Sequence, residues 1–164
     1  MTVHKVHRHM AKAPTVVDAL VKGAKAAMEL RHANVLSVLD AGVQDGEPWV
    51  AVEYGGESLA TMLRLAGPDG LPVPVALRVA IDVIEGFAAA HAHQPALGHG
   101  EVGPWTVHVG SDGVARVSGF QFDQALWRFG AHYVKNLERL SYAAPERVRA
   151  MSSTLGQNLS VADE

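Results

Sequence analysis

Histidine is the residue type in this sequence that is best suited to bind a metal ion or to exchange a proton near neutral pH. The 164 residues include nine histidines, and His4, His7 and His9 stand close together near the start. Because side chains alternate along a strand, a strand here would place His7 and His9 on one face and His4 on the other. His91 and His93 lie two positions apart on a predicted helix, where they point in different directions. Neither group supplies three converging ligands, so we predict no metal site.

Lys5 and Glu101 are two further residues whose side chains could take part in binding or catalysis. Lys5 lies near the end of a predicted strand over residues 2–6, and its ammonium group could contact a phosphate, although a lysine at the end of a strand is commonly solvated. Glu101 stands in the stretch His99–Thr106, where its carboxylate could accept a proton. The plain alternative for Glu101 is a surface carboxylate in a loop. Taken alone, neither residue defines a reaction.

The composition is that of a globular domain with one core. Hydrophobic residues make up 48% of the chain and charged residues 19%, and the formal net charge is −3. This charge gives no basic surface for nucleic acid or for an anionic membrane. The absence of cysteine excludes disulfides, thiolate metal sites and a cysteine nucleophile. No apolar stretch is long enough to span a bilayer, and we expect a cytoplasmic protein without nucleic-acid or membrane partners.

Hydrophobic periodicity predicts an α+β order of elements. The first third is expected to contain a strand over residues 2–6, a helix over 14–30, and strands over 35–39 and 49–54 joined through an Asp45-Gly46 turn. Gly55 and Gly56 then break the pattern and mark a hinge.

The rest of the chain is expected to be mainly helical. We predict helices over 58–65 and 75–91, a hairpin with strands over 107–109 and 114–117, and a long surface segment over 120–141. The longest helix has an apolar stripe opposite a polar one, so we expect the first to be buried and the second to be in solvent. The apolar stripe comprises Leu77, Ile81, Ile84, Ala88 and His91, and the polar one Arg78, Asp82 and Glu85.

Four short segments, in this order and spacing, resemble protein kinases, especially the eukaryotic-like Ser/Thr kinases of bacteria. Val3-His4-Lys5-Val6 is similar to the VAIK strand, and Arg31-His32-Ala33-Asn34-Val35 to the RHPN segment. Ala89-Ala90-His91-Ala92-His93 is similar to the end of the helix that precedes the catalytic loop. Tyr142-Ala143-Ala144-Pro145-Glu146 is similar to the end of the activation segment. The resemblance runs from Thr2 to about Arg149.

The resemblance implies a partial bilobal kinase-like fold. Residues 1–54 would form a reduced N-lobe of about three antiparallel strands and one helix, and residues 55–164 a partial, mainly helical C-lobe with a β-hairpin. The hinge would be Tyr54-Gly55-Gly56. Relative to the family, we expect the chain to begin at the third strand, without the Gly-rich loop, and to stop before the central C-lobe helix. The family's packing spine would be kept by Ala27, Val38, His99 and Phe120, which makes His99 a structural histidine.

The resemblance also assigns site residues. The nucleotide pocket would contain Lys5, Glu53, Tyr54 and His108, and the catalytic base position would be Glu101. Several partners of these groups are replaced, however. Gly23 stands at the position of the helix glutamate that orients the lysine, and Gly103 replaces the lysine of the catalytic loop.

The magnesium-binding positions are replaced as well. Thr106 stands where the family has asparagine, and Gly119 where it has the aspartate of DFG. Asp123 is the only nearby carboxylate, and it lies four residues after the position where the family has the aspartate of DFG. If ATP binds at all, we therefore expect it to bind without magnesium. Trp105, inside the altered catalytic loop, could plug the substrate cleft.

Three functions remain open. Because packing positions survive and charge-handling positions do not, we favour a catalytically inactive pseudokinase that acts as a binding or scaffolding module in signalling. Its partner would be another protein or a second copy, bound through the sheet edge at residues 2–6 or the apolar face of helix 75–91. The first alternative is a divergent Ser/Thr kinase that uses Lys5 and Glu101, with magnesium held by Thr106 and Asp123. The second is a fragment of a longer kinase gene.

Overall fold

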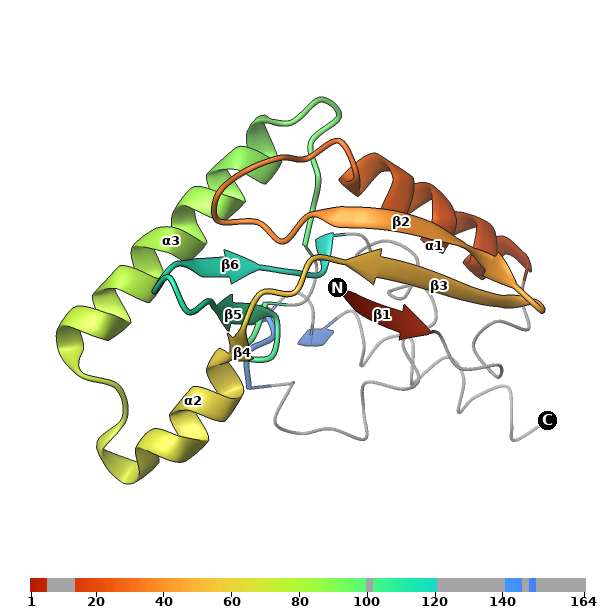
Figure 1. Ribbon diagram of the computed structural model, residues 1–164. Coiled ribbons are helices and arrows are strands. Elements are labelled where there is room, and N and C mark those ends of the chain that lie inside the picture. Colours follow the sequence, from red (N-terminus) through yellow and green to blue (C-terminus); the bar gives the residue numbers. More distant parts are fainter. Residues whose placement is uncertain (6–13, 100–101, 121–140, 146–147, 150–164) are drawn as a thin grey trace.

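The computed structural model describes residues 1–5, 14–99, 102–120, 141–145 and 148–149. These residues form two antiparallel three-stranded sheets and three α-helices, with residues 53–56 leading from one sheet to the other (Figure 1). The α+β class and the partial bilobal architecture expected from the resemblance are confirmed.

The first sheet has the strand order β1–β3–β2, with β1 at Thr2–Lys5, β3 at Glu47–Val52 and β2 at Val38–Gln44. Asp45 and Gly46 join β2 to β3, and both have positive φ values of 54° and 77°. Two residues with positive φ suit a tight hairpin, because they match the twist of the flanking strands. Helix α1, Pro14–Ala27, packs against β2 and β3 (Figure 1). The three strands and one helix expected of the N-lobe are therefore present.

The second sheet is smaller and has the order β4–β5–β6. Its strands are β4 at Glu57–Ser58, β5 at Val107–Val109 and β6 at Ala115–Val117. After β4 the chain enters α2, Leu59–Ala66, where the Ser58 hydroxyl accepts a hydrogen bond from the Thr61 N–H at 3.2 Å and caps the helix. A short 3-10 helix, Gly67–Asp69, leads to α3, Val73–Ala92. Helix α3 packs across β6 on the outside of the molecule (Figure 1).

Residues 34–36 connect the two parts. The Val117 N–H donates to the Asn34 carbonyl, and the Leu36 N–H donates to the Val117 carbonyl, both at 2.9 Å. Val35 forms a parallel bridge with Val117. The expected strand over 35–39 is therefore wrong at its start: the backbone of 34–36 is bonded to β6, and β2 begins only at Val38.

The main core lies between α1, the first sheet, the end of α3 and the segment after β6. It includes Ala27, Val38 and Phe120, and the His99 ring meets Phe120 edge to face at a centroid distance of 4.8 Å. His99 is buried, with 6% of its surface exposed. The expected packing spine and the structural role of His99 are thus confirmed.

Helix α3 is rotated relative to the expectation from its periodicity. The buried residues are Val79, Asp82, Gly86 and Ala90. Leu77, Ile81 and Ile84 are exposed, as is His91. The prediction of a buried apolar stripe and a solvated Asp82 is wrong, because Asp82 bonds to β6 and Gly86 allows the helix backbone to approach the Asn34 carbonyl.

Some predicted features lie outside the described residues. These are the surface segment over 121–140 with Asp123, the catalytic-loop residue Glu101, and the histidines at 7 and 9. Within the described residues, no three side chains form a metal-binding group, and no helix is both long and apolar enough to cross a membrane.

Candidate functional site

His108 lies at the centre of the second sheet, in the middle of β5. It pairs with Ser58 of β4 on one side and with Arg116 of β6 on the other. The ring is half-buried and forms a hydrogen bond to the backbone of Gly56, the last residue of the hinge. The structure therefore places His108 close to the segment that contains Glu53 and Tyr54.

Burial lowers the pKa of His108, and the charge of His4 lowers it further. The bond to Gly56 and the carboxylate of Glu57 act in the opposite direction without reversing the shift. At neutral pH the imidazole is accordingly uncharged. A neutral aromatic ring at this position can stack on another flat group but offers no positive charge to a phosphate.

The register of the first sheet fixes the face on which Lys5 lies. In β1, His4 is opposite Val50 of β3, and Lys5 is opposite Trp49. Directly opposed residues in an antiparallel pair project from the same face of the sheet. His4 therefore shares the face of Val50, which belongs to the core under α1, whereas Lys5 shares the other face with Trp49. Of the four predicted nucleotide residues, Glu53, Tyr54 and His108 lie at or beside the hinge, whereas Lys5 lies in the first sheet, on the face opposite to that of His4.

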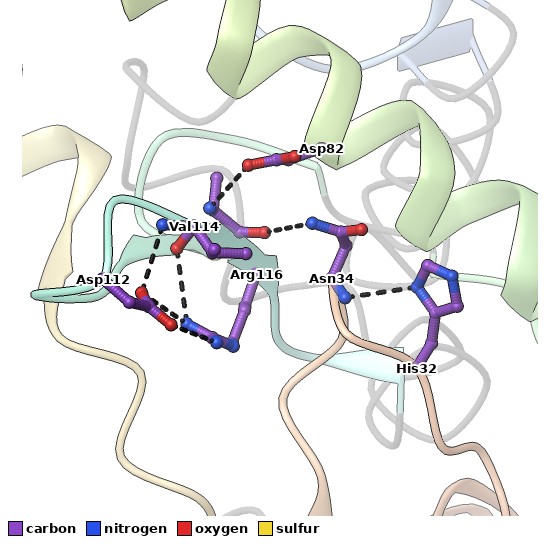
Figure 2. Close-up of polar contacts among 7 residues, drawn as sticks. His32, Asn34, Asp82, Asp112, Val114 and Arg116 are labelled. Carbon is purple, nitrogen blue, oxygen red and sulfur yellow. Dashed lines mark hydrogen bonds and ion pairs between the residues drawn. The ribbon is translucent and has the colours of Figure 1, made fainter.

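A cavity of about 660 Å³ lies along the hinge. Glu53 and Tyr54 line it, but neither Lys5 nor His108 does. Its other lining residues include Glu57, Met62, Asp112 and Arg116, which belong to β4, α2 and the β5–β6 hairpin. Arg116 and Asp112 form an ion pair at 2.7 Å within this wall (Figure 2), and Arg116 lowers the pKa of Asp112 to about 2. With its single arginine already paired, the wall has an excess of carboxylates, which repel a triphosphate.

The catalytic-loop positions that the structure describes are occupied by local contacts. The Thr106 hydroxyl donates to the Gly103 carbonyl at 2.9 Å and accepts from the Gly103 N–H at 3.2 Å. A Cβ atom on Gly103 would collide with the indole of Trp105. That indole also meets the Tyr142 ring edge to face at 5.4 Å, and Tyr142 begins the segment that resembles the end of an activation segment. The Trp105 indole thus occupies the space that the Cβ atom of any larger residue at position 103 would need.

The segment after β6 is built for packing. The His99 Nε2 lies 2.6 Å from the Ser118 carbonyl oxygen, and it must be the donor because a carbonyl only accepts. Gly119 has φ of +105°, a backbone conformation that L-residues rarely adopt. A Cβ atom on Gly119 would stand 3.2 Å from His99 Nε2. This position has no side chain to offer a ligand and little room to gain one.

These residues do not fit a magnesium ion. Magnesium in proteins is held by carboxylates together with phosphate oxygens and water. The two described positions that the resemblance assigns to the metal are Gly119, which has no side chain, and Thr106, whose hydroxyl is already bonded to Gly103.

A buried polar network behind β6 was not predicted from the sequence. The Asp82 carboxylate accepts from the Ala115 N–H at 2.9 Å, and the Asn34 amide donates to the Ala115 carbonyl at 3.0 Å (Figure 2). Arg78 forms an ion pair with Asp82 at 3.0 Å. Burial alone raises the pKa of Asp82, but the bonds from Ala115, Arg78 and Asn34 bring it below its usual value. The signal in the sequence is the Arg78–Asp82 spacing of four on a helix, which also fits a surface pair.

The comparisons with known proteins agree with this geometry. Over 161 residues the chain is 30% identical to the tyrosine-protein kinase MasK of Myxococcus xanthus. The aligned region covers 91% of the chain and 25% of that kinase. Over 133 residues it is 28% identical to the serine/threonine-protein kinase PrkC of Bacillus subtilis, covering 80% of the chain and 20% of the kinase. The chain resembles the protein kinases. The resemblance stated from the four short segments is thereby confirmed.

The likeness extends to eukaryotic kinases. The serine/threonine-protein kinase fray1 of Dictyostelium discoideum is 26% identical over 108 residues, which cover 65% of the chain and 18% of that kinase. This kinase-like chain spans a quarter or less of the length of these three relatives. No protein-family model matches it.

Proposed function

We propose that this kinase-like chain is a binding module in signalling that does not transfer phosphate. The observation that carries the proposal is Gly119 at the position of the magnesium-binding aspartate. Its φ of +105° and its closeness to His99 disfavour any residue with a side chain. Phosphoryl transfer depends on metal ions that neutralise the phosphate oxygens, and a glycine cannot hold one.

The catalytic loop supports the same conclusion. In kinases this loop supplies charged and polar groups to the reacting phosphate. Here Gly103 is covered by the Trp105 indole, and the Thr106 hydroxyl is bonded to Gly103. Lys5 lies on the sheet face opposite to that of His4 and Val50. Two positions that would have to converge on a phosphate, Gly103 and Thr106, are thus replaced and occupied by local contacts.

The residues at packing positions, in contrast to those at charge-handling positions, are kept. Ala27, Val38 and Phe120 belong to one buried cluster, and His99 stacks within it. When the core of a fold is kept and its charge-handling positions are altered, the function is expected to depend on the shape and surface of the fold and not on catalysis. We therefore infer a scaffolding role in which the fold presents surfaces to a protein partner.

Nucleotide binding without transfer is a separate part of the proposal. His108 lies half-buried beside the hinge, and a neutral imidazole can stack on a purine. The excess of carboxylates along the hinge cavity opposes the phosphates, so any nucleotide should bind weakly. Because the magnesium positions are lost, the metal should not improve this binding.

The deciding experiment measures phosphate transfer and nucleotide binding on the same samples. The purified chain is incubated with radiolabelled ATP, with and without magnesium, together with a general protein substrate, and its thermal unfolding is followed under the same conditions. We expect no transferred label and no magnesium-dependent rise in the unfolding temperature. Transfer that is abolished by Lys5→Ala and by Glu101→Gln would overturn the proposal and establish a divergent kinase. A stabilisation by ATP that requires magnesium would contradict the loss of the metal site.

A further inference from the structure

Helix α3 carries an apolar stripe on its outer surface. Leu77, Ile81 and Ile84 are 59%, 56% and 65% exposed, and Ala88 continues the line. Successive members are four, three and four residues apart, which places them on one side of an α-helix. The buried residues Val79, Asp82, Gly86 and Ala90 occupy the opposite side. Three large aliphatic side chains in one exposed row are unusual on a surface that stays in water.

The spacing of the stripe is that of a helix-pairing seam. Alternating steps of four and three residues are the a and d positions of a heptad, with Leu77 and Ile84 at d and Ile81 and Ala88 at a. Val73, which is 70% exposed, lies one turn before Leu77 at a g position and adds an apolar side chain beside the row. The seam contains no charged residue, so a second helix laid along it would meet only apolar side chains.

The charges that flank the seam are on one side only. Arg78 and Glu85 both occupy e positions of this heptad, and both are exposed. The corresponding g positions are Ala80 and Phe87, which carry no charge. In a parallel pair of helices, e positions face g positions, whereas in an antiparallel pair they face e positions of the other helix. A parallel pair would therefore leave both charges without a counterpart.

We propose that α3 pairs with α3 of a second copy of this chain in an antiparallel, two-fold symmetric arrangement. Layers of the seam then match Leu77 with Ala88 and Ile81 with Ile84 of the other copy. Arg78 of each copy faces Glu85 of the other, so one symmetric contact forms two opposite-charge pairs. This charge complementarity is what favours a second copy over an unrelated apolar partner.

The contact of Arg78 inside its own chain is compatible with this role. Its Nε is bonded to Asp82 Oδ1 at 3.0 Å, and the side chain remains 61% exposed. A guanidinium has five N–H donors, so those not used by Asp82 can reach a carboxylate across the interface. Asp82 lies on the buried side of the helix, so its bond to Nε leaves the terminal nitrogens of the guanidinium as the donors for the second copy.

The first test is the oligomeric state of the full chain by sedimentation equilibrium over a range of concentrations. We expect a reversible dimer with twice the 17.4 kDa mass of the chain. Ile81→Asp should raise the dissociation constant by at least about tenfold, because the symmetric interface loses two isoleucines and gains two buried charges. Val3→Asp, at a 49% exposed position on the edge strand β1, is the matched control and should leave the dimer unchanged. Far-UV circular dichroism of both variants establishes that they fold.

A second test addresses the direction of the helices. Glu85→Arg places arginine opposite Arg78 in the antiparallel pair and should weaken the dimer more than Glu85→Gln does, with the difference shrinking at high salt. A monomer at all concentrations would overturn the proposal, as would a dimer that Val3→Asp disrupts and Ile81→Asp does not. Loss of the dimer in Ile81→Asp without any effect of Glu85→Arg would overturn the antiparallel arrangement. None of these outcomes depends on whether the chain binds ATP or transfers phosphate.

Discussion

The side-chain amide of Asn34 donates a hydrogen bond to the Ala115 carbonyl at 3.0 Å, across 81 positions of the sequence. Asn34 is buried, and its own carbonyl accepts from Val117 at 2.9 Å. The segment that follows α1 is in this way fixed to β6 of the second sheet (Figure 2). The orientation of the two sheets therefore depends on a polar contact as well as on the apolar core.

Asn34→Ala should destabilise the whole fold. The substitution leaves the Ala115 carbonyl without this donor in a buried site, which costs about 1–3 kcal/mol of unfolding free energy. Urea unfolding followed by circular dichroism measures the change. Glu29→Ala, at an exposed position just after α1, is the control and should stay within about 0.5 kcal/mol of the parent chain. Equal stabilities of the two variants would refute a structural role for the amide.

Asp82 should make the fold sensitive to acid. Its pKa is lowered in the folded state, so its carboxylate stabilises the fold above the unfolded-state pKa of about 4 and ceases to do so as the pH falls further. We expect the unfolding free energy of the parent chain to decline below about pH 4. Asp82→Asn should be less stable at pH 7 and should decline less over the same range. A parallel decline in both proteins would show that other carboxylates are responsible.

Restoring the missing carboxylate should not restore a metal site. Gly119→Asp forces a side chain into a conformation with φ of +105° beside His99, at a cost of about 1–3 kcal/mol. Gly113→Asp is the matched control, since Gly113 also has positive φ but has open space around it. Thermal unfolding should show the larger loss for Gly119→Asp. A stable Gly119→Asp variant that gains magnesium-dependent ATP binding would contradict our description of this site.

Local features of the fold could be predicted from the sequence, and orientations could not. The Asp45-Gly46 turn follows from residues that tolerate positive φ, so the β2–β3 hairpin was expected. The prediction of which face of α3 is buried was wrong. Periodicity shows that the two faces of a helix differ, but it does not show which of them is covered by the rest of the protein. Asp82 is buried by a bond to a backbone N–H 33 positions further on, which no local pattern encodes.

The same limit applies to the candidate site. Residue type alone indicated that Gly119 has no side chain to hold a metal, whereas the bonds between the Thr106 hydroxyl and Gly103 required the structure. The face on which Lys5 lies depends on the register between β1 and β3, where Lys5 is opposite Trp49. Register is set by pairing between distant segments, so the sheet face on which Lys5 lies required the structure.

Trp105 and Gly103 should be energetically coupled. A Cβ atom on Gly103 collides with the indole, so Gly103→Ala should cost about 1–3 kcal/mol through overpacking. In a Trp105→Ala background the obstacle is gone, and the same substitution should cost much less. The four proteins form a double-mutant cycle that urea unfolding can measure. Additive effects would show that the indole does not occupy the space beside Gly103.

His108 should produce a second loss of stability at a higher pH than that of Asp82. Burial, together with the charge of His4, lowers its folded pKa below 6.5, while the unfolded chain still protonates its histidine near 6.5. As the pH falls through this window, the unfolded state takes up a proton before the folded state does, so the unfolding free energy decreases. His108→Gln carries no titrating group at this position and should flatten the decline below pH 6.5 while leaving the one below about pH 4 in place. The same decline in unfolding free energy for His108→Gln and for the parent chain between pH 6.5 and 5 would contradict this prediction. It would show that the folded protein does not hold the imidazole of His108 in its neutral form.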